Sequence, residues 1–249
     1  MRSETPCRRC GEVFFLHRPT LFSIIMTADH RLPTTDHPPL VPVFPGTPRK
    51  NDGLFLYGAI CAKPWVYAYC QESAEVVRGP SCMPENEIHP ARCAADGVPV
   101  RERRGGGGTV LLSPGMVVVI VVNERGAGDG IRDIFSRIHQ AMVRLLDPRG
   151  ALGITEQGLS DLAVGGMKIL GSSLYLPQKP RFYYYQSSLM VDPDLSLLTR
   201  YLKHPPREPA YRRGRSHGEF CTSLRAAGCR LTVEEIRDML NGRLGALVH

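Results

Sequence analysis

An uninterrupted apolar run from Met116 to Val122 constrains the fold of this chain more than any other feature. Six of its seven residues are valine or isoleucine, whose branched side chains favour extended backbone. A strand with one face in water alternates apolar and polar residues, so this run predicts a strand buried on both faces. Seven residues also fall far short of the ~20 that cross a bilayer, so we expect no membrane span here.

Shorter patterned segments around this run predict an α+β fold. Apolar residues spaced three and four apart in Ile131–Leu146 are typical of an amphipathic helix. Further strands are predicted at residues 65–69, 74–77, 109–112, 161–164, 167–170 and 182–191, and further helices at 87–95, 194–202 and 233–240. Because the strands cluster rather than alternate strictly with helices, we expect a mixed or antiparallel sheet flanked by helices.

Local signals predict where several of these elements begin or turn. Gly165-Gly166 is typical of a tight hairpin turn, because glycine tolerates positive φ. Asp192 is predicted to cap the helix at 194–202, with Pro193 at its first position. Thr232-Val-Glu-Glu235 has the spacing of a capping box for the last helix.

Residues 1–53 differ in composition from the rest of the chain. Eight of the 21 prolines fall there, and proline removes backbone donors that helices and sheets need. We therefore predict a Pro-rich, poorly ordered extension at 1–53 and a functional domain at 54–249. A signal peptide would show an apolar stretch followed by a small-residue cleavage site, and we recognise no such pattern in this sequence. We therefore expect a cytoplasmic protein with no membrane partner.

The eight cysteines are expected to be thiols in a reducing compartment. Cys7 and Cys10 have the spacing of a metal-binding pair, with His17 and His30 downstream. No second close pair completes a zinc site, so we interpret the pair as incidental and predict no metal-binding residues.

The charge distribution indicates an anionic partner. The chain has 31 Lys and Arg against 24 Asp and Glu. Basic residues concentrate toward the C-terminal end, at Arg200, Lys203, Arg207, Arg212, Arg213, Arg215, Arg225 and Arg230. Such a cluster suits a nucleotide, a nucleic acid or an acidic protein. Because no nucleic-acid-binding motif accompanies it, nucleic acid is the weaker interpretation.

Four consecutive glycines, at 105–108, follow the basic segment Arg101–Arg104 and precede a predicted strand. Such a loop leaves backbone N–H groups unshielded, so it can surround an anion, and nearby guanidinium groups strengthen the attraction. The segment lacks the Lys-Ser/Thr of a P-loop, and no helix follows as in a dinucleotide site. On composition alone, a flexible hairpin tip is the simpler interpretation.

Lys168 lies on the strand after the Gly-Gly turn and is followed by Gly171-Ser172-Ser173. A lysine on a strand usually faces water. Here the small residues after it leave room for a ligand beside the ammonium, which could hold a carboxylate or phosphate oxygen.

Four segments resemble, in order and spacing, the motifs of the catalytic domain shared by lipoate–protein ligases, octanoyltransferases and biotin ligases. They are the glycine segment Glu102–Val110, then Ser160-Asp161-Leu162 with Gly166–Ser172, then Ser188–Leu195, and finally Cys221–Leu224. Together the motifs cover roughly residues 64–225. The resemblance implies a class II synthetase-like, biotin-protein-ligase-like α+β domain.

The ligase branch implies a two-step reaction. Lipoate or octanoate reacts with ATP, accompanied by Mg²⁺, to give an acyl-AMP, and a lysine of a lipoyl carrier domain then takes the acyl group. The carrier is a 2-oxo acid dehydrogenase subunit, the glycine cleavage H protein or a similar protein. The accessory domain of larger ligases is not recognised in this sequence, so the resemblance implies either a compact single-domain ligase or a separate accessory polypeptide that supplies that part.

The resemblance also implies roles for individual residues. Lys168 contacts the lipoyl carbonyl and the α-phosphate, Arg103 pairs with phosphate, and Asp161 orients the nucleotide or its Mg²⁺. Backbone donors come from Gly106, Gly107 and Gly108, and the remaining binding residues are Thr109, Gly171, Ser172 and Ser188. Arg212, Arg213 and Arg215 are expected to assist docking of an acidic lipoyl domain.

Two alternatives stay open at this point. Octanoyltransferases use a cysteine nucleophile, and the nearest counterpart here is Cys221, which directly precedes Thr222 rather than lying a few residues upstream. A non-catalytic acyl- or nucleotide-binding relative is the other, because Glu102, Ser160 and Gln186 depart from the family pattern.

Overall fold

The computed structural model describes residues 50–61, 64–178 and 181–248, so Cys7 and Cys10 and nearly all of the predicted extension lie outside the described residues. The described helices are α2 (Asp52–Cys61), α3 (Pro84–Glu87), α4 (Pro90–Ala95), α5 (Ile131–Leu146), α6 (Ser196–Tyr201), α7 (His217–Phe220), α8 (Val233–Arg243) and the short 3₁₀ helix η1 (Leu244–Leu247). The strands are β1 (Trp65–Cys70), β2 (Glu75–Arg78), β3 (Val100–Glu102), β4 (Val110–Leu112), β5 (Met116–Glu124), β6 (Ile154–Gln157), β7 (Asp161–Val164), β8 (Met167–Tyr175) and β9 (Phe182–Met190). None of the described helices is long and apolar enough to cross a membrane.

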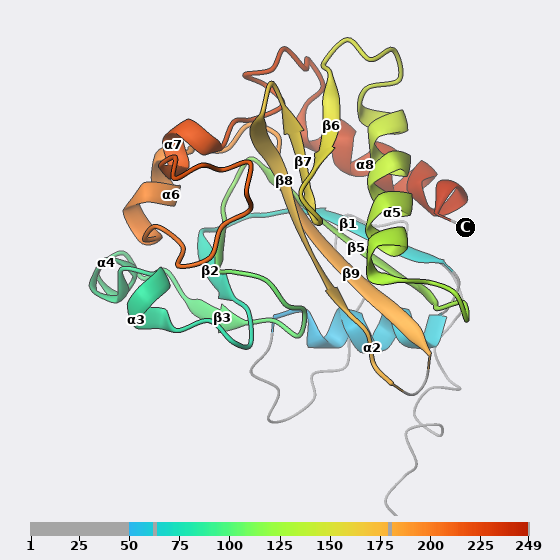
Figure 1. Cartoon of the computed structure of the whole chain (residues 1–249), viewed down its shortest axis with the longest axis horizontal. Coiled ribbons are helices and arrows are strands. Elements are labelled where there is room, and N and C mark those ends of the chain that lie inside the picture. Colours follow the sequence, from blue (N-terminus) through green and yellow to red (C-terminus); the bar gives the residue numbers. More distant parts are fainter. Residues whose placement is uncertain (1–49, 62–63, 179–180, 249) are drawn as a thin grey trace, which may run out of the picture. The chain divides into compact units, whose positions relative to one another are not determined.

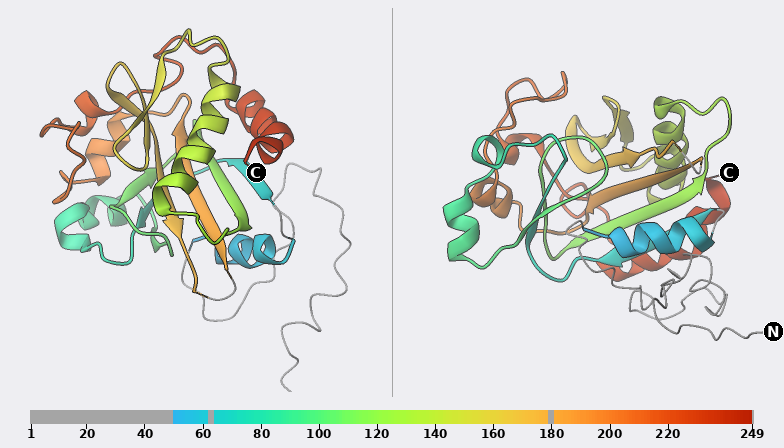
Figure 2. Two further views of the ribbon diagram at one scale, coloured as in Figure 1. Left: turned by 45° about the vertical axis from the view of Figure 1, so that its right-hand side comes forward. Right: turned by 90° about the horizontal axis from the view of Figure 1, so that it is seen from below.

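The strands form two sheets (Figures 1 and 2). The larger has the order β1-β5-β9-β8-β7-β6, and every neighbouring pair in it is antiparallel. The smaller has the order β3-β2-β4, with β2 parallel to β3 and antiparallel to β4. The predicted α+β class, with mixed and antiparallel sheets and flanking helices, is confirmed.

Strand β5 lies inside the larger sheet and is buried on both faces, as its composition predicts. Val117, Val119 and Val121 pack in the core cluster that contains the apolar stripe of α5 and the buried residues of α8. On the opposite face, Ile120 and Val122 pack with α2 and β1, and Val118 packs against the smaller sheet. The Ser113–Gly115 hinge therefore carries the chain from the smaller sheet into the larger one.

Most local signals produce the expected structure. Gly165 and Gly166 adopt φ of 56° and 74° in the turn between β7 and β8. At α8, the Thr232 hydroxyl and the Glu235 carboxylate form the predicted capping box.

The continuous helix predicted at 87–95 and the cap predicted at Asp192 were wrong, and α2, α7 and η1 were not predicted. The proposed helix at 87–95 is divided into α3 and α4, because Pro90 lacks the N–H that a continuous helix would need. Asp192 does not cap α6, which begins at Ser196, and Asp194 instead accepts a hydrogen bond from the Ser196 amide. The proposed boundary after residue 53 falls inside the first turn of α2, for which no sequence pattern was recognised.

Candidate functional site

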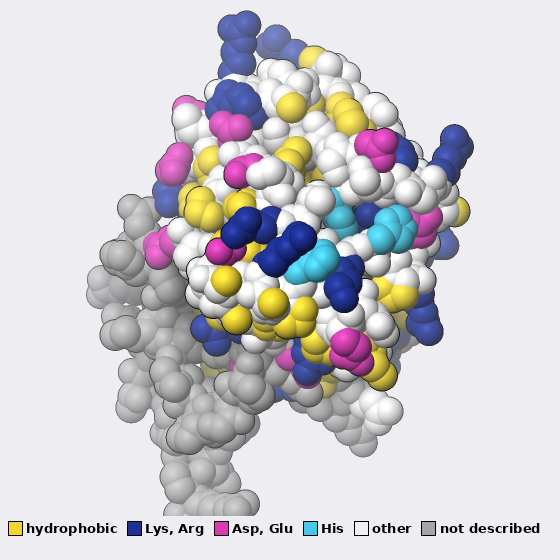
Figure 3. All heavy atoms as spheres, turned by 90° about the vertical axis from the view of Figure 1, so that its left-hand side faces the viewer, with side chains coloured by type: hydrophobic (Ala, Val, Ile, Leu, Met, Phe, Trp, Pro, Cys, Tyr) yellow, Lys and Arg dark blue, Asp and Glu magenta, His cyan; other side chains and the backbone are white. Residues whose placement is uncertain are grey.

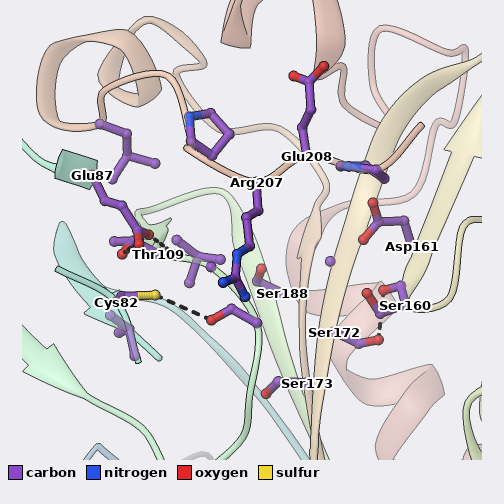
Figure 4. A pocket seen from close by; sticks show the side chains of 18 of the residues that line it. Cys82, Glu87, Thr109, Ser160, Asp161, Ser172, Ser173, Ser188, Arg207 and Glu208 are labelled. Atoms are coloured by element: carbon purple, nitrogen blue, oxygen red, sulfur yellow. Dashed lines mark hydrogen bonds between the residues drawn. The ribbon is translucent and has the colours of Figure 1, made fainter. Parts of the chain in front are cut away.

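A cavity of about 820 Å³ is lined by residues of both sheets and of the segment 202–212. Its apolar lining includes Val77, Val110, Leu112 and Val118, which come from β2, β4 and β5. Polar and charged side chains occupy the rest of the wall, and Figure 4 shows them converging from several elements. A cavity with one apolar part and one charged part fits a ligand with an apolar chain and an ionic end.

The register of the larger sheet brings three predicted site residues into one row. Ser188 on β9 pairs with Val118 on one side and with Gly171 on the other, and Gly171 pairs in turn with Asp161. Directly opposed residues of antiparallel strands point to the same face, so this row forms part of the cavity wall.

A register shift in the β7–β8 pair places Lys168 on that same face. Leu162 pairs with Leu170 but Ala163 pairs with Lys168, so Ile169 has no partner and forms a bulge. Without the bulge, Lys168 would follow the buried residue Leu170 onto the core face. With it, Lys168 lines the cavity. The sequence pattern contains no signal for this bulge that we recognised.

The Lys168 ammonium is held by Asp161. Lys168 Nζ lies 2.8 Å from Asp161 Oδ1, and the other carboxylate oxygen accepts a 2.8 Å hydrogen bond from the Tyr211 hydroxyl. Burial and the Asp161 charge raise the pKa of Tyr211, so it remains a donor. A Cβ at Gly171 would lie 2.7 Å from Lys168 Nζ, so glycine there gives the ammonium its place. Each oxygen of Asp161 thus has one partner within the protein.

Arg103 does not project into the cavity as a free cation. One of its terminal nitrogens donates to the carbonyl oxygens of Gly106 and Gly108 at 2.8 Å each, and the other donates to the Val77 carbonyl. Burial lowers the pKa of Arg103, with Cys82 and Glu87 acting in the opposite direction. The side chain therefore organises the glycine loop from within.

The glycine loop is held by its carbonyl groups rather than its amides. The Cys82 thiol donates to the Gly107 carbonyl, between the two carbonyls bound by Arg103. The amides of Gly106, Gly107 and Gly108 form no hydrogen bond with another described residue. Gly107 and Gly108 line the cavity, and Gly106 is not among its lining residues. Donation from these amides to an anion stays a prediction.

Thr109 is engaged by Glu87, a residue that the sequence analysis missed. Glu87 Oε2 accepts from the Thr109 amide at 2.9 Å and from the Thr109 hydroxyl at 2.7 Å (Figure 4). Burial alone would raise the pKa of Glu87, but these hydrogen bonds hold it below its ordinary value. Thr109 therefore anchors the loop to α3, and the proposed continuous helix over 87–95 concealed this role of Glu87.

Ser172 also forms its hydrogen bonds within the protein. Its hydroxyl donates to the Ser160 carbonyl at 2.7 Å (Figure 4) and lies 3.1 Å from His139 Nε2. Burial lowers the pKa of His139 to about 4, so the ring is neutral at pH 7. His139 lies on α5, where it looks like an ordinary interior residue in the sequence.

The segment 203–216 supplies cations to the other side of the cavity. Arg215 donates to the backbone carbonyls of Gly166, Tyr211, Arg212 and Glu219 and so ties this segment to the β7–β8 turn. Arg212 is buried in the cavity wall, and Figure 4 shows Arg207 reaching from this segment into the cavity. Only Arg213 of the three arginines proposed for docking is exposed. Figure 3 shows Lys, Arg and His side chains gathered on the face that carries these elements.

Two cysteines lie close to this site, and the described cysteines are free thiols. Cys221 forms a β-bridge with Lys168 but does not line the cavity, and burial raises the pKa of its thiol. Cys82 lines the cavity, yet its thiol donates to Gly107 and burial raises its pKa as well. Neither environment favours a thiolate.

Within the described ranges, no three His, Cys, Asp or Glu side chains gather closely enough to hold a metal ion.

Comparisons with known proteins identify the family and the fold. The family described as Lipoyl protein ligase A/B catalytic domain matches residues 62–244. No curated protein sequence matches the chain.

Solved structures of lipoate ligases share the fold. A bi-partite lipoate protein ligase from Thermoplasma acidophilum, solved in a study of it and its E2 lipoyl domain, has 22% identity and a TM-score of 0.63 over 75% of this chain and 72% of that one. Lipoate-protein ligase A bound with ATP also has 22% identity and a TM-score of 0.63, over 75% and 73%. LipL1 of P. falciparum in complex with lipoate has 18% identity and a TM-score of 0.60, over 75% and 50%.

Proposed function

Since the chain belongs to the lipoyl protein ligase A/B catalytic-domain family, we propose that it joins lipoate or octanoate to AMP and transfers the acyl group to a lysine of a lipoyl carrier domain. The observation that carries this proposal is the placing of Lys168 on the same cavity as the unbonded amides of the glycine loop. The carrier is a 2-oxo acid dehydrogenase subunit, the glycine cleavage H protein or a similar protein.

In the first step, a carboxylate oxygen of the acid attacks the α-phosphorus of ATP. The bond from that phosphorus to the bridging oxygen of the β-phosphate breaks, and pyrophosphate leaves with the electron pair. Two anions repel as they approach, so fixed cations and backbone donors lower the barrier. Lys168 supplies the cation, the amides of Gly107 and Gly108 supply donors, and Mg²⁺ arrives with ATP.

In the second step, the neutral amine of the carrier lysine attacks the acyl carbon. The bond from that carbon to the phosphate oxygen breaks, AMP leaves, and the amine loses a proton to water. We assign Asp161 to holding the Lys168 ammonium, because its two oxygens accept from Lys168 and Tyr211. The apolar lining at Val77, Val110, Leu112 and Val118 suits the acyl chain.

Adenylation is favoured over a cysteine-dependent octanoyl transfer by the surroundings of the thiols. A ping-pong transfer needs an accessible thiolate. Cys221 lies outside the cavity lining, and the Cys82 thiol is a donor to Gly107.

The test is lipoate-dependent exchange of labelled pyrophosphate into ATP by the full chain. Lys168→Ala should lower the exchange rate by about 100-fold or more, because it removes a fixed donor to the reacting oxygens. Gly171→Ala should lower it by about 100-fold with little change in stability, because its methyl group displaces the ammonium. Binding of lipoate and AMP by the wild type without any exchange would instead indicate a non-catalytic relative.

A further inference from the structure

Arg212 is a buried cation whose strongest donors are unused. The residue is only 4% exposed. Its Nε donates to the Arg215 carbonyl at 2.9 Å, and its guanidinium lies 4.8 Å from the centre of the Phe220 ring. Neither terminal nitrogen forms a hydrogen bond with a described residue, and Nη2 is sealed from solvent. Glu208 is its nearest carboxylate partner, 3.5 Å from Nε.

Such an arrangement costs free energy unless an anion completes it. A buried charge needs a partner of opposite sign, and buried N–H groups need acceptors. Glu208 faces Nε and leaves the terminal fork without an acceptor. Because Arg212 lines the cavity, a ligand there can supply the missing acceptor oxygens.

Lys168 is a second cation beside the same part of the cavity. Lys168 lines the same cavity, and its charge and that of Arg212 both act on His217 and Cys221. Lys168 is already paired with Asp161, and Glu208 faces only the Nε of Arg212, so the terminal fork of Arg212 keeps donors for an anionic ligand. A phosphate carries more charge than an acyl carboxylate and offers oxygens to both cations.

We propose that Arg212 binds the phosphate group of the AMP moiety, on the side opposite the glycine loop, and this inference rests on the proposed function. Its planar fork suits two phosphate oxygens at once. The phosphate that remains in AMP is present in ATP, in the acyl-AMP and in the product, so Arg212 serves both steps. Its interaction with the phosphate strengthens most in the second step, because negative charge returns to the phosphate as AMP leaves.

The experiment measures the dissociation constants of AMP, inorganic pyrophosphate and lipoate for the full chain by titration calorimetry. Arg212→Gln should raise the dissociation constant of AMP by about 10- to 100-fold, because two hydrogen bonds from a charged group are lost. The dissociation constant of lipoate should change by less than about threefold, since its carboxylate is assigned to Lys168 and the glycine loop. Arg213→Gln is the matched control, because Arg213 is the exposed neighbour and removes the same charge.

The outcomes separate this inference from the proposed function. Wild-type protein that neither binds AMP nor exchanges pyrophosphate contradicts the proposed function itself. Wild-type protein that does both, with equal AMP affinity in Arg212→Gln, overturns the role of Arg212 alone. An equal loss in Arg213→Gln, or a loss confined to pyrophosphate, overturns it too.

A spectroscopic readout covers the case in which Arg212→Gln fails to fold. The guanidinium N–H signals of Arg212, assigned by their disappearance in Arg212→Lys, should shift when AMP is added to the wild type. No shift at saturating AMP would contradict the contact.

Discussion

Two arginines border the same cavity from opposite walls, and their surroundings differ in one decisive respect. Both are buried, with Arg103 6% exposed and Arg212 4%. The terminal nitrogens of Arg103 donate to three backbone carbonyls, whereas those of Arg212 donate to no described residue. An arginine whose terminal nitrogens donate to the chain maintains a structure, and one whose terminal nitrogens are free is available to a ligand.

Substitution of these two arginines should therefore give the largest difference in the free energy of unfolding of the protein. Arg103→Met should lower the free energy of unfolding by about 3 kcal/mol, because it leaves buried carbonyls without donors. Arg212→Met should change it by less than about 1 kcal/mol or raise it, because it removes a buried cation whose terminal nitrogens have no acceptor among the described residues. Urea denaturation at pH 7.5 measures both values. Equal losses of unfolding free energy in the two variants would contradict the assignment of Arg103 to structure and of Arg212 to ligand binding.

A second prediction concerns Glu87, which anchors the wall of Arg103. Glu87→Gln should lower the free energy of unfolding by about 1–2 kcal/mol at pH 7, because hydrogen bonds to a carboxylate are stronger than those to an amide. The folded pKa of Glu87 lies below its unfolded value, so its contribution is complete above that unfolded value and is lost as pH falls through the folded pKa.

The difference between wild type and Glu87→Gln should therefore shrink below about pH 4. Glu85→Gln is the control, because Glu85 lies on the same helix, is exposed, and its carboxylate makes no hydrogen bond to a described residue. A difference that stays constant down to pH 3 would show that the Glu87 carboxylate is not the stabilising group.

Some features of the fold and the site could be predicted from residue type and spacing, and others could not. Composition and period predicted β5, α5 and the β7–β8 turn, because burial and helical spacing leave a direct imprint on residue type. The order of the motifs placed Gly171 and Ser188 in the site, and the sheet register brings them together.

Other features depended on contacts that no local pattern contains. The bulge at Ile169 decides which face Lys168 occupies, and a one-residue shift is not visible in composition. Arg103 lies in the glycine motif, yet its donors turn toward the loop itself. Arg212 lies in a non-periodic segment rich in proline and arginine, where burial could not be predicted.

The wall of Arg212 can be probed through His217. Burial, followed by the charges of Arg212, His204 and Lys168, lowers the pKa of His217 to about 4, so the ring is neutral at pH 7. Arg212→Gln should raise this pKa while leaving it below its ordinary value, because burial remains. Titration of the imidazole signals by NMR measures the change.

His139 is the internal control for this titration. Its pKa is also about 4, lowered by burial, but the charge that acts on it is Asp161. It should therefore titrate alike in wild type and Arg212→Gln. Equal shifts at both histidines would indicate a general change in the fold rather than the loss of one nearby charge.

The smallest effect is expected at the two thiols, one beside each wall. Cys221→Ala should leave lipoate-dependent pyrophosphate exchange within about twofold of wild type, because this thiol lies outside the cavity lining. Cys82→Ala should lower exchange by less than about tenfold, because the Gly107 carbonyl loses one weak donor while Arg103 still holds its neighbours. Incubation with octanoyl-acyl carrier protein, followed by mass spectrometry, should show no thioester on either cysteine. A thioester that forms and is then consumed by a lipoyl domain would overturn this expectation: the wall carrying that cysteine would hold the nucleophile, and the cations on the opposite wall would serve substrate binding in a transferase.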